Sequence, residues 1–258
     1  MQIISLTFDD GLRCQMERAV PILDQYGLPA TFFIAANTNP EQLDYCPHAP
    51  WRKTEWNPAD VRTLKDMTRR GHEIGSHSVS HKSSEDPNIR PALDREYQAG
   101  DEAGKSKRLI SDWMETEIPS FAYPFCHRGG GLKEAVKAAG YKQARAGAGG
   151  VCYRIGDSLD DYFDIDCRFV GNNSRRREDV ASWKCHGDHW CVLTFHGIGV
   201  VHASRDPSRD PDGWLSISPD EFAREMSELA GYRDAGEVEV LTFADAAERM
   251  RTANRAGN

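Results

Sequence analysis

Short apolar runs alternate with segments of helical periodicity along most of this chain, and this alternation limits its possible folds more than any other feature. A composition typical of strands occurs in residues 3–8, 30–36, 72–76, 120–125, 141–146, 162–170, 192–195 and 238–242. Apolar positions at helical spacing occur in residues 15–26, 58–70, 91–115, 132–139, 219–229 and 244–251. Alternating strands and helices form parallel sheets with helices packed outside. The chain is therefore predicted to be an α/β protein, with one domain over residues 1–258.

Polar residues follow several of the predicted strands directly. Asp9 and Asp10 follow the strand 3–8, His77 follows 72–76, and His196 follows 192–195. In a barrel of parallel strands the C-terminal strand ends share one face, and that face carries the active site. We therefore expect these side chains to converge.

Charge and hydropathy exclude several classes of function. Acidic residues outnumber Lys and Arg by 40 to 32, for a net charge of −8. Duplex nucleic-acid binders usually present a basic face, so no nucleic-acid partner is expected. No window approaches the ~18 apolar residues of a membrane-spanning helix, and no signal peptide is visible. A cytoplasmic location is expected if residue 1 is the native start, and a secreted or cell-envelope location if a signal peptide was removed. The sequence leaves the oligomeric state open.

Cysteine and histidine spacing gives weaker information. The seven cysteines are scattered, and no pair has CxxC spacing, which argues against a zinc ribbon. Reduced thiols are the simplest interpretation, although disulfides stay open. His186 and His189 lie near two cysteines, but without regular zinc-site spacing. Their role stays undetermined.

Two motifs have the residue types of a hydrolytic metal site. His77 and His81 form an HxxxH arrangement, and on a helical turn such side chains share one face and can share a metal. The alternative is two unrelated surface histidines. Asp9-Asp10-Gly11 is either a simple turn or a pair with divided roles, one carboxylate completing the metal site and the other acting as general base. His196 is either a structural histidine or a general acid that protonates the leaving group.

Four segments, taken together, resemble a known family. They are Thr7-Phe8-Asp9-Asp10-Gly11, Gly75-Ser76-His77-Ser78-Val79-Ser80-His81, Phe121-Ala122-Tyr123-Pro124-Phe125 and Leu193-Thr194-Phe195-His196. In order and spacing they are similar to the successive motifs of the polysaccharide deacetylases, the proteins with a NodB homology domain, also called carbohydrate esterase family four. The resemblance extends from Ile3 to about Arg251. It implies an irregular (β/α) barrel with seven strands.

The same resemblance implies an activity and a set of residue roles. The enzyme would be a metal-dependent hydrolase that removes N- or O-linked acetyl groups from a polysaccharide or oligosaccharide. The implied roles are base for Asp9, metal ligand for Asp10, His77 and His81, general acid for His196, and oxyanion donor for the backbone N–H of Phe125. Zn²⁺ is the expected metal, and Co²⁺ or Ni²⁺ also suit these ligands. Substrate contacts are expected from Tyr123, Pro124, Phe125 and Trp214, while Trp56 in the long 37–57 segment is expected to be structural.

The chain departs from the family pattern in three places. Many members carry an arginine in the third motif that contacts the base, but Ala122–Phe125 contains none. Arg168 is hypothesised to supply that charge, the alternative being an ordinary surface arginine. The family's fourth motif, an Asp followed shortly by Trp, is not evident here, and Asp164 and Asp166 are candidates to orient His196. Cys126 replaces a glycine often found there, and Arg128 either meets a polar or acidic sugar substituent or faces solvent.

Two other functions are compatible with the same fold. Some relatives hydrolyse small amides, mostly cyclic ones, but those typically lack metal ligands that this chain retains. A catalytically inactive carbohydrate-binding relative is the other alternative, and the complete catalytic set argues against it. Metal content together with acetate release from acetylated chitooligosaccharides or xylan would separate the three.

Overall fold

The computed structural model describes residues 1–36, 56–81, 99–147, 149–159, 161–171, 180–183, 187–199 and 216–257. Its strands are β1 (Gln2–Phe8), β2 (Thr31–Ile34), β3 (Glu73–Ser76), β4 (Ser120–Ala122), β5 (Gln143–Arg145), β6 (Tyr153–Arg154), β7 (Arg168–Phe169), β8 (His189–Phe195) and β9 (Val238–Val240). Its α-helices are α1 (Val20–Tyr26), α2 (Pro58–Arg69), α4 (Ser106–Met114), α5 (Leu132–Ala138), α6 (Val180–Trp183), α7 (Pro219–Asp234) and α8 (Phe243–Gly257). Two π-helices, η1 (Gln15–Ala19) and η3 (Asp101–Lys105), precede α1 and α4, and a 3₁₀ turn, η4 (Pro124–Cys126), follows β4.

Within the described residues, nine strands form one curled sheet in the order β5-β4-β3-β2-β1-β8-β6, with β9 beside β1 and β7 beside β8. Every pairing is parallel except that of β6 with β8. A parallel bridge from Arg145 to Ile165 connects β5 to the segment leading into β7, so the sheet curls back toward β8. The expected α/β barrel-like fold class is confirmed. The strand count exceeds the seven that the resemblance implied, because each of the eight predicted runs contributes a strand, residues 162–170 only at β7, and the short β6 adds an antiparallel edge.

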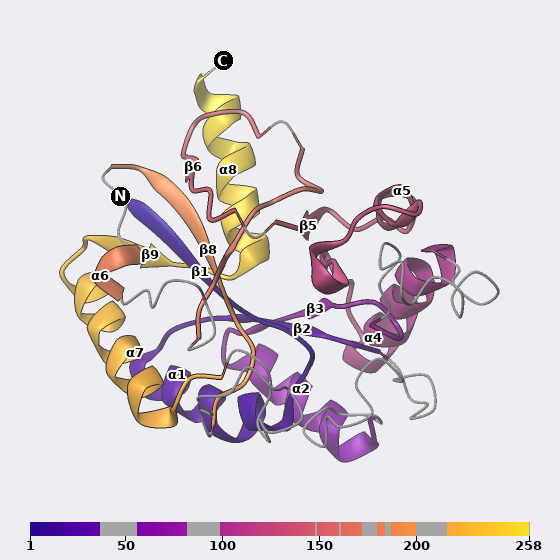
Figure 1. The fold of residues 1–258 in the computed structure, drawn as a ribbon, viewed down its shortest axis with the longest axis horizontal. Coiled ribbons are helices and arrows are strands. Elements are labelled where there is room, and N and C mark those ends of the chain that lie inside the picture. Colours follow the sequence, from indigo (N-terminus) through magenta and orange to yellow (C-terminus); the bar gives the residue numbers. More distant parts are fainter. Residues whose placement is uncertain are drawn as a thin grey trace.

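β1 separates two apolar layers. Ile4, Leu6 and Phe8 belong to the cluster between the sheet and the outer helices, where α7, α1 and α2 lie in a row along one side of the strands (Figure 1). The Phe8 ring stacks on Phe32 of β2 at 4.7 Å and on Phe195 of β8 at 5.2 Å. Because side chains alternate along a strand, the residues between these three face the inside of the curled sheet.

The inside of the sheet is apolar at one end and polar at the other. Ile3 belongs to an inner cluster that includes residues of β2, β8 and α8. The N–H of Phe243 donates to Thr31 Oγ1 at the start of β2 (2.8 Å), so α8 covers the end where β2 begins. Farther along β1 the inward residue is Thr7, whose hydroxyl lies 2.9 Å from that of Thr194. Asp9 continues this row, because its N–H still pairs with the carbonyl of Phe195 (3.1 Å).

Helix boundaries follow the chemistry of their ends. The Asn57 side chain accepts from the N–H groups of Ala59 (2.8 Å) and Asp60 (3.1 Å), and Asp60 accepts from the N–H of Asn57 (2.9 Å). This capping box, with Pro58 in the first turn, confirms the predicted start of α2.

None of the helices among the described residues is both long and apolar enough to cross a membrane.

The expectation of reduced thiols is wrong for one pair of cysteines. Cys152, just before β6, forms a disulfide with Cys191 of β8, with Cα atoms 4.6 Å apart. Among the other described cysteines, Cys126 and Cys167 are free thiols. Sequence spacing cannot reveal this pair, because the cysteines are 39 residues apart and meet only through the antiparallel pairing of β6 with β8.

Candidate active site

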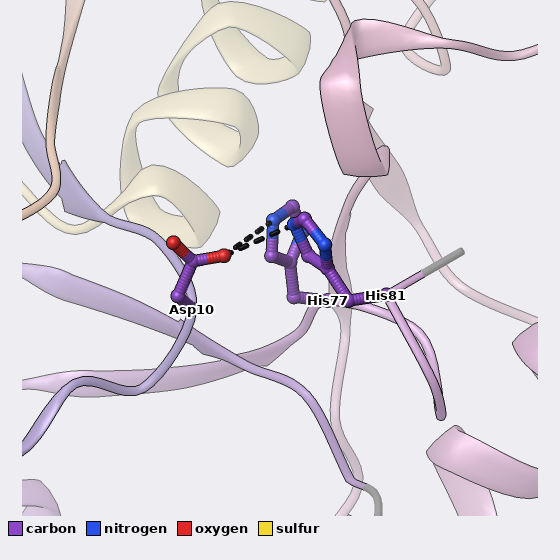
Figure 2. A group of neighbouring side chains, drawn as sticks. All are labelled: Asp10, His77 and His81. Carbon is purple, nitrogen blue, oxygen red and sulfur yellow. Dashed lines mark ion pairs between the residues drawn. The ribbon is translucent and has the colours of Figure 1, made fainter. Parts of the chain in front are cut away.

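The predicted metal ligands gather at the C-terminal strand ends, as expected for a barrel of parallel strands. Asp10 follows β1, and His77 follows β3 with His81 four residues later. Their ligand atoms all lie within 4.8 Å of one another, and all three residues are buried (Figure 2). Nε2 of His81 is 3.0 Å from Oδ1 of Asp10, and Nε2 of His77 is 3.7 Å from the same oxygen. Two imidazoles and one carboxylate are a donor set that suits zinc and other late divalent metals, so these residues fit a cation.

His77 presents an uncharged ring to this cluster. Its Nδ1 lies 2.8 Å from the carbonyl oxygen of Ala122 at the end of β4. A carbonyl only accepts, so Nδ1 carries the proton and Nε2 keeps its lone pair. Burial lowers the pKa of His77 to about 4, against the opposing charge of Asp9. The fold thus holds the tautomer that a metal ligand requires.

The HxxxH segment is not the helical turn that its spacing suggests. Residues 77–81 contain no helical turn: Val79 and Ser80 form a bend, and Ser78 (φ 69°) and His81 (φ 56°) have left-handed backbone conformations. The loop is tied to the sheet by the N–H of Ala36, which donates to the carbonyl of Ser78 (2.9 Å). The hydroxyl of Ser78 accepts from the N–H of His81 (3.0 Å). The two imidazoles therefore meet through a folded loop rather than through helical periodicity.

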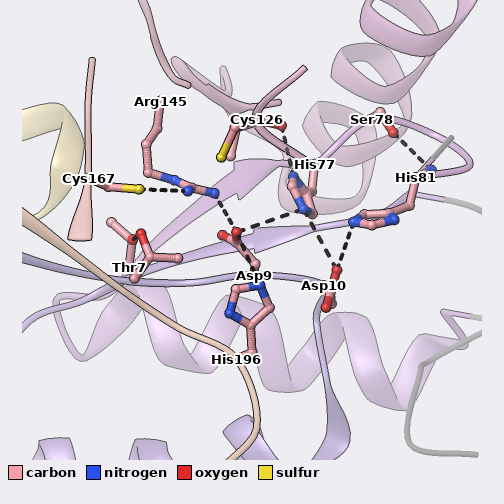
Figure 3. A network of polar contacts seen from close by, with 12 residues as sticks. Thr7, Asp9, Asp10, His77, Ser78, His81, Cys126, Arg145, Cys167 and His196 are labelled. Carbon is pink, nitrogen blue, oxygen red and sulfur yellow. Dashed lines mark hydrogen bonds and ion pairs between the residues drawn. The ribbon is translucent and has the colours of Figure 1, made fainter. Parts of the chain in front are cut away.

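Asp9 lies beside the metal cluster and also contacts Arg145 and His196. It is 3% exposed, and its Oδ2 lies 2.5 Å from Nη2 of Arg145, 3.8 Å from Nε2 of His196 and 3.9 Å from Nε2 of His77 (Figure 3). Its Oδ1 is buried and has no hydrogen-bond partner among the described residues. The guanidinium of Arg145 therefore holds one carboxylate oxygen of Asp9, while the other oxygen is available to accept a proton.

Arg145, rather than the hypothesised Arg168, supplies the charge beside Asp9. Arg145 ends β5 and is 1% exposed. Its Nη1 donates to the Sγ of Cys167 (3.2 Å), and its guanidinium lies over the Phe33 ring at 5.5 Å. Burial lowers the pKa of Arg145, but the charge of Asp9 together with the neighbouring Cys167 and Cys126 outweighs burial, so the pKa is raised. Arg168 instead donates to backbone carbonyls, those of residues 150 (3.0 Å) and 182 (3.3 Å).

A glycine on the next strand makes room for this arrangement. A Cβ on Gly75 of β3 would lie 2.5 Å from the Phe33 ring. The absence of a side chain there lets Phe33 pack inside the sheet, beneath the guanidinium of Arg145. Gly75 therefore contributes to the site through Phe33 rather than through contact with a ligand.

Gln15 is a site-supporting residue that sequence reasoning missed. Its Nε2 donates to the backbone carbonyls of Asp9 (2.6 Å) and His196 (2.9 Å), and its Oε1 accepts from the N–H of Leu12 (3.1 Å). Gln15 is fully buried at the start of η1. It joins the ends of β1 and β8, and the available sequence clue was a glutamine shortly after the Asp-Asp-Gly segment.

His196 lies where the general acid was expected, but neither proposed aspartate is seen to orient it. The ring of Phe169 lies 5.6 Å from that of His196. The carboxylate of Asp166 accepts backbone N–H groups at positions 149, 151 and 167. Asp164 forms an ion pair with Arg128 (3.0 Å). Asp166 therefore organises the backbone of residues 149–167, while Asp164 connects its own segment to the one that follows η4.

The residues expected to contact substrate differ in exposure. Tyr123 is 1% exposed, and its hydroxyl donates to the carbonyl of Phe163 (3.2 Å), so it is a core residue. Pro124 is also buried. Phe125 is 37% exposed, has φ 56°, and its ring lies 4.7 Å from that of the metal-ligand candidate His81. Trp214 lies outside the described residues.

The remaining residues with a predicted role are Trp56, His186, His189 and Arg128. Trp56 is buried and donates to the carbonyl of Ala35 (2.9 Å), as expected for a structural residue. His186 lies outside the described residues, and His189 begins β8. Arg128, in its ion pair with Asp164, is partly exposed. The role of His186 and His189 stays undetermined.

Comparisons with known proteins give a family match and several similar folds. The family model for polysaccharide deacetylase matches residues 1–144, and no significant match was found among curated proteins. Similar solved structures include a putative polysaccharide deacetylase from Mycobacterium smegmatis (14% identity, 97% of this chain and 90% of that one, TM-score 0.57). Another is the Xyl-CE4 domain of a multidomain xylanase from the hindgut metagenome of Trinervitermes trinervoides (15% identity, 96% of this chain and 90% of that one, TM-score 0.54). A third is a family 4 acetyl xylan esterase from Clostridium thermocellum in complex with a cobalt ion (16% identity, 95% of this chain and 89% of that one, TM-score 0.53).

Proposed function

Because the chain belongs to the polysaccharide deacetylase family, we propose that it is a metal-dependent hydrolase that removes acetyl groups from an acetylated carbohydrate. The observation that carries the proposal is that the adjacent carboxylates of Asp9 and Asp10 have different surroundings and can take different roles. Asp10 lies with His77 and His81 in a cation-sized cluster. Asp9, one residue earlier, has a buried oxygen without a hydrogen-bond partner among the described residues.

The side chains beside the cluster suit acyl transfer to water. Asp10, His77 and His81 would hold a divalent cation, which would supply Lewis-acid chemistry toward an acyl carbonyl and a water molecule. Oδ1 of Asp9 accepts the proton of the attacking water, since Oδ2 is held by Arg145. His196, whose Nε2 is 3.8 Å from Asp9, protonates the departing nitrogen or oxygen. The backbone N–H of Phe125 is the proposed donor to the developing oxyanion.

The test is acetate release from acetylated chitooligosaccharides and acetylated xylan, with protein stripped by chelator and then restored with Zn²⁺ or Co²⁺. We expect turnover only after metal is restored. Asp9→Asn and His196→Gln should each lower kcat by about 10²–10⁴-fold, the usual contribution of a general base or acid. His189→Gln, at the opposite end of β8, is the matched control and should leave kcat unchanged.

Each alternative function predicts a different result. Turnover that persists after complete chelation would refute metal dependence. Hydrolysis of small cyclic amides without acetate release would identify the amide hydrolase. Binding of acetylated oligosaccharide by metal-loaded protein with no turnover would identify an inactive carbohydrate-binding relative.

A further inference from the structure

The loop that carries His81 is held by a residue outside every motif described above. Glu102 lies on η3, the π-helical turn that precedes α4. Its Oε2 accepts from the N–H groups of Val79 (3.0 Å) and Ser80 (2.9 Å), and its Oε1 accepts from the hydroxyl of Ser80 (2.6 Å). One carboxylate therefore receives three hydrogen bonds from the tip of the loop between the two histidines.

These hydrogen bonds hold a part of the loop whose backbone conformation is unfavourable. Ser78 and His81, on either side of the tip, both have positive φ, a conformation that non-glycine residues adopt rarely. Val79 and Ser80 are 8% and 5% exposed, so their N–H groups need a protein partner. A charged acceptor makes stronger hydrogen bonds than a neutral one. Glu102 thus favours the one loop conformation in which His81 faces Asp10.

The two histidines depend on this support to different degrees. The N–H of His77 donates to the carbonyl of Ile34 (2.8 Å), and its ring bonds to the carbonyl of Ala122 (2.8 Å). His77 is therefore fixed by neighbouring strands. The backbone of His81 bonds within the loop, to the hydroxyl of Ser78, so its position follows the loop conformation.

We propose that Glu102 is a positioning residue for the metal site, which presets the 78–81 loop so that His81 is aimed at Asp10 before a cation binds. The inference rests on the proposed function, because it takes Asp10, His77 and His81 as the metal ligands. Without Glu102, binding must also order the loop, and that ordering weakens affinity. The outer-shell partners of metal ligands typically contribute about 10–100-fold in affinity.

The test is calorimetric titration of chelator-stripped protein with Zn²⁺ and with Co²⁺. Glu102→Ala should weaken metal binding by about 10–100-fold. Glu102→Gln should bind within about threefold of wild type, because the amide oxygen can accept both N–H groups and the amide nitrogen can donate to the Ser80 hydroxyl. Ser80→Ala, which removes one of the three bonds, should be intermediate. Glu117→Ala is the matched control, since Glu117 lies on the surface and pairs with Lys107 (3.4 Å).

Cobalt absorption gives a second measurement that a general loss of stability would not reproduce. At saturating Co²⁺, the visible spectrum of Glu102→Ala should move toward that of His81→Ala, while Glu102→Gln should keep the wild-type spectrum. If Glu102→Ala does not fold, Ser80→Ala and Glu102→Asp still decide the question. The shorter aspartate should bind metal more weakly because it cannot reach all three donors.

The outcomes separate this inference from the proposed function. Wild-type affinity in both Glu102→Ala and Ser80→Ala, or in Ser80→Ala and Glu102→Asp where the alanine variant does not fold, would overturn the role of Glu102 and leave the metal site intact. Glutamine that binds as weakly as alanine would also overturn it, because positioning by hydrogen bonds predicts rescue. Wild-type protein that takes up neither metal would refute the proposed metal site itself.

Discussion

Replacing Arg145 with glutamine tests how the fold holds the catalytic carboxylate of Asp9 in place. Arg145 and Asp9 are 1% and 3% exposed, and their closest atoms are 2.5 Å apart. At an effective dielectric constant of about 20, charges about 2.5–4 Å apart attract by roughly 4–7 kcal/mol. Desolvation of both groups offsets much of this attraction. Removing one partner leaves the other buried and uncompensated, which typically costs about 3–5 kcal/mol.

Arg168→Gln is the matched control, because Arg168 was the arginine that sequence reasoning placed beside Asp9. Its observed bonds to two backbone carbonyls are worth about 0.5–1.5 kcal/mol each. Urea unfolding in the presence of chelator measures both variants without a contribution from bound metal. We expect Arg145→Gln to lose about 3–5 kcal/mol and Arg168→Gln clearly less. The double variant Asp9→Asn with Arg145→Gln should lose less than the sum of its single changes.

Activity gives an independent readout of the same pair. Without the guanidinium, Oδ2 of Asp9 loses the group that holds it, so the general base is no longer fixed in place. We expect kcat of Arg145→Gln to fall by up to about 10²–10⁴-fold, the usual contribution of a general base, while Arg168→Gln should keep the wild-type kcat. Equal stability losses in the two variants, or a wild-type kcat in Arg145→Gln, would refute the assignment of Arg145 to Asp9.

Three further predictions concern the scaffold. Cys152→Ser should lower the free energy of unfolding by about 2–4 kcal/mol, because its bond to Cys191 closes a loop with a sequence separation of 39; unchanged urea unfolding under oxidising conditions would contradict the disulfide. Burial lowers the pKa of His72 despite the nearby Asp24, so the unfolded chain binds the proton more readily, and stability should fall as pH drops below about 6.5. His72→Gln should weaken that pH dependence, as measured by urea midpoints in chelator. Gly75→Ala should cost about 1–3 kcal/mol, since the new methyl would meet the Phe33 ring, and a variant as stable as wild type would show that the ring moves freely.

The sequence alone was sufficient for the features that depend on local periodicity and on the ends of strands. Alternating runs predicted a parallel sheet with outer helices, and Asn57 with Pro58 marked the start of α2. The positions of Asp10 and His77 after strands predicted that they meet, because parallel strands place their C-terminal ends on one face. These features are encoded within a few residues of where they act.

Tertiary structure decided which distant side chains support that site. Arg145, not Arg168, reaches Asp9, because the answer depends on how far the sheet curls and which strand end then faces β1. The Cys152–Cys191 disulfide and the hydrogen bonds that Glu102 accepts from the 78–81 loop also form only in the folded structure. Such contacts depend on strand register and on left-handed backbone conformations at particular residues, and neither can be predicted from the spacing of residues along the chain.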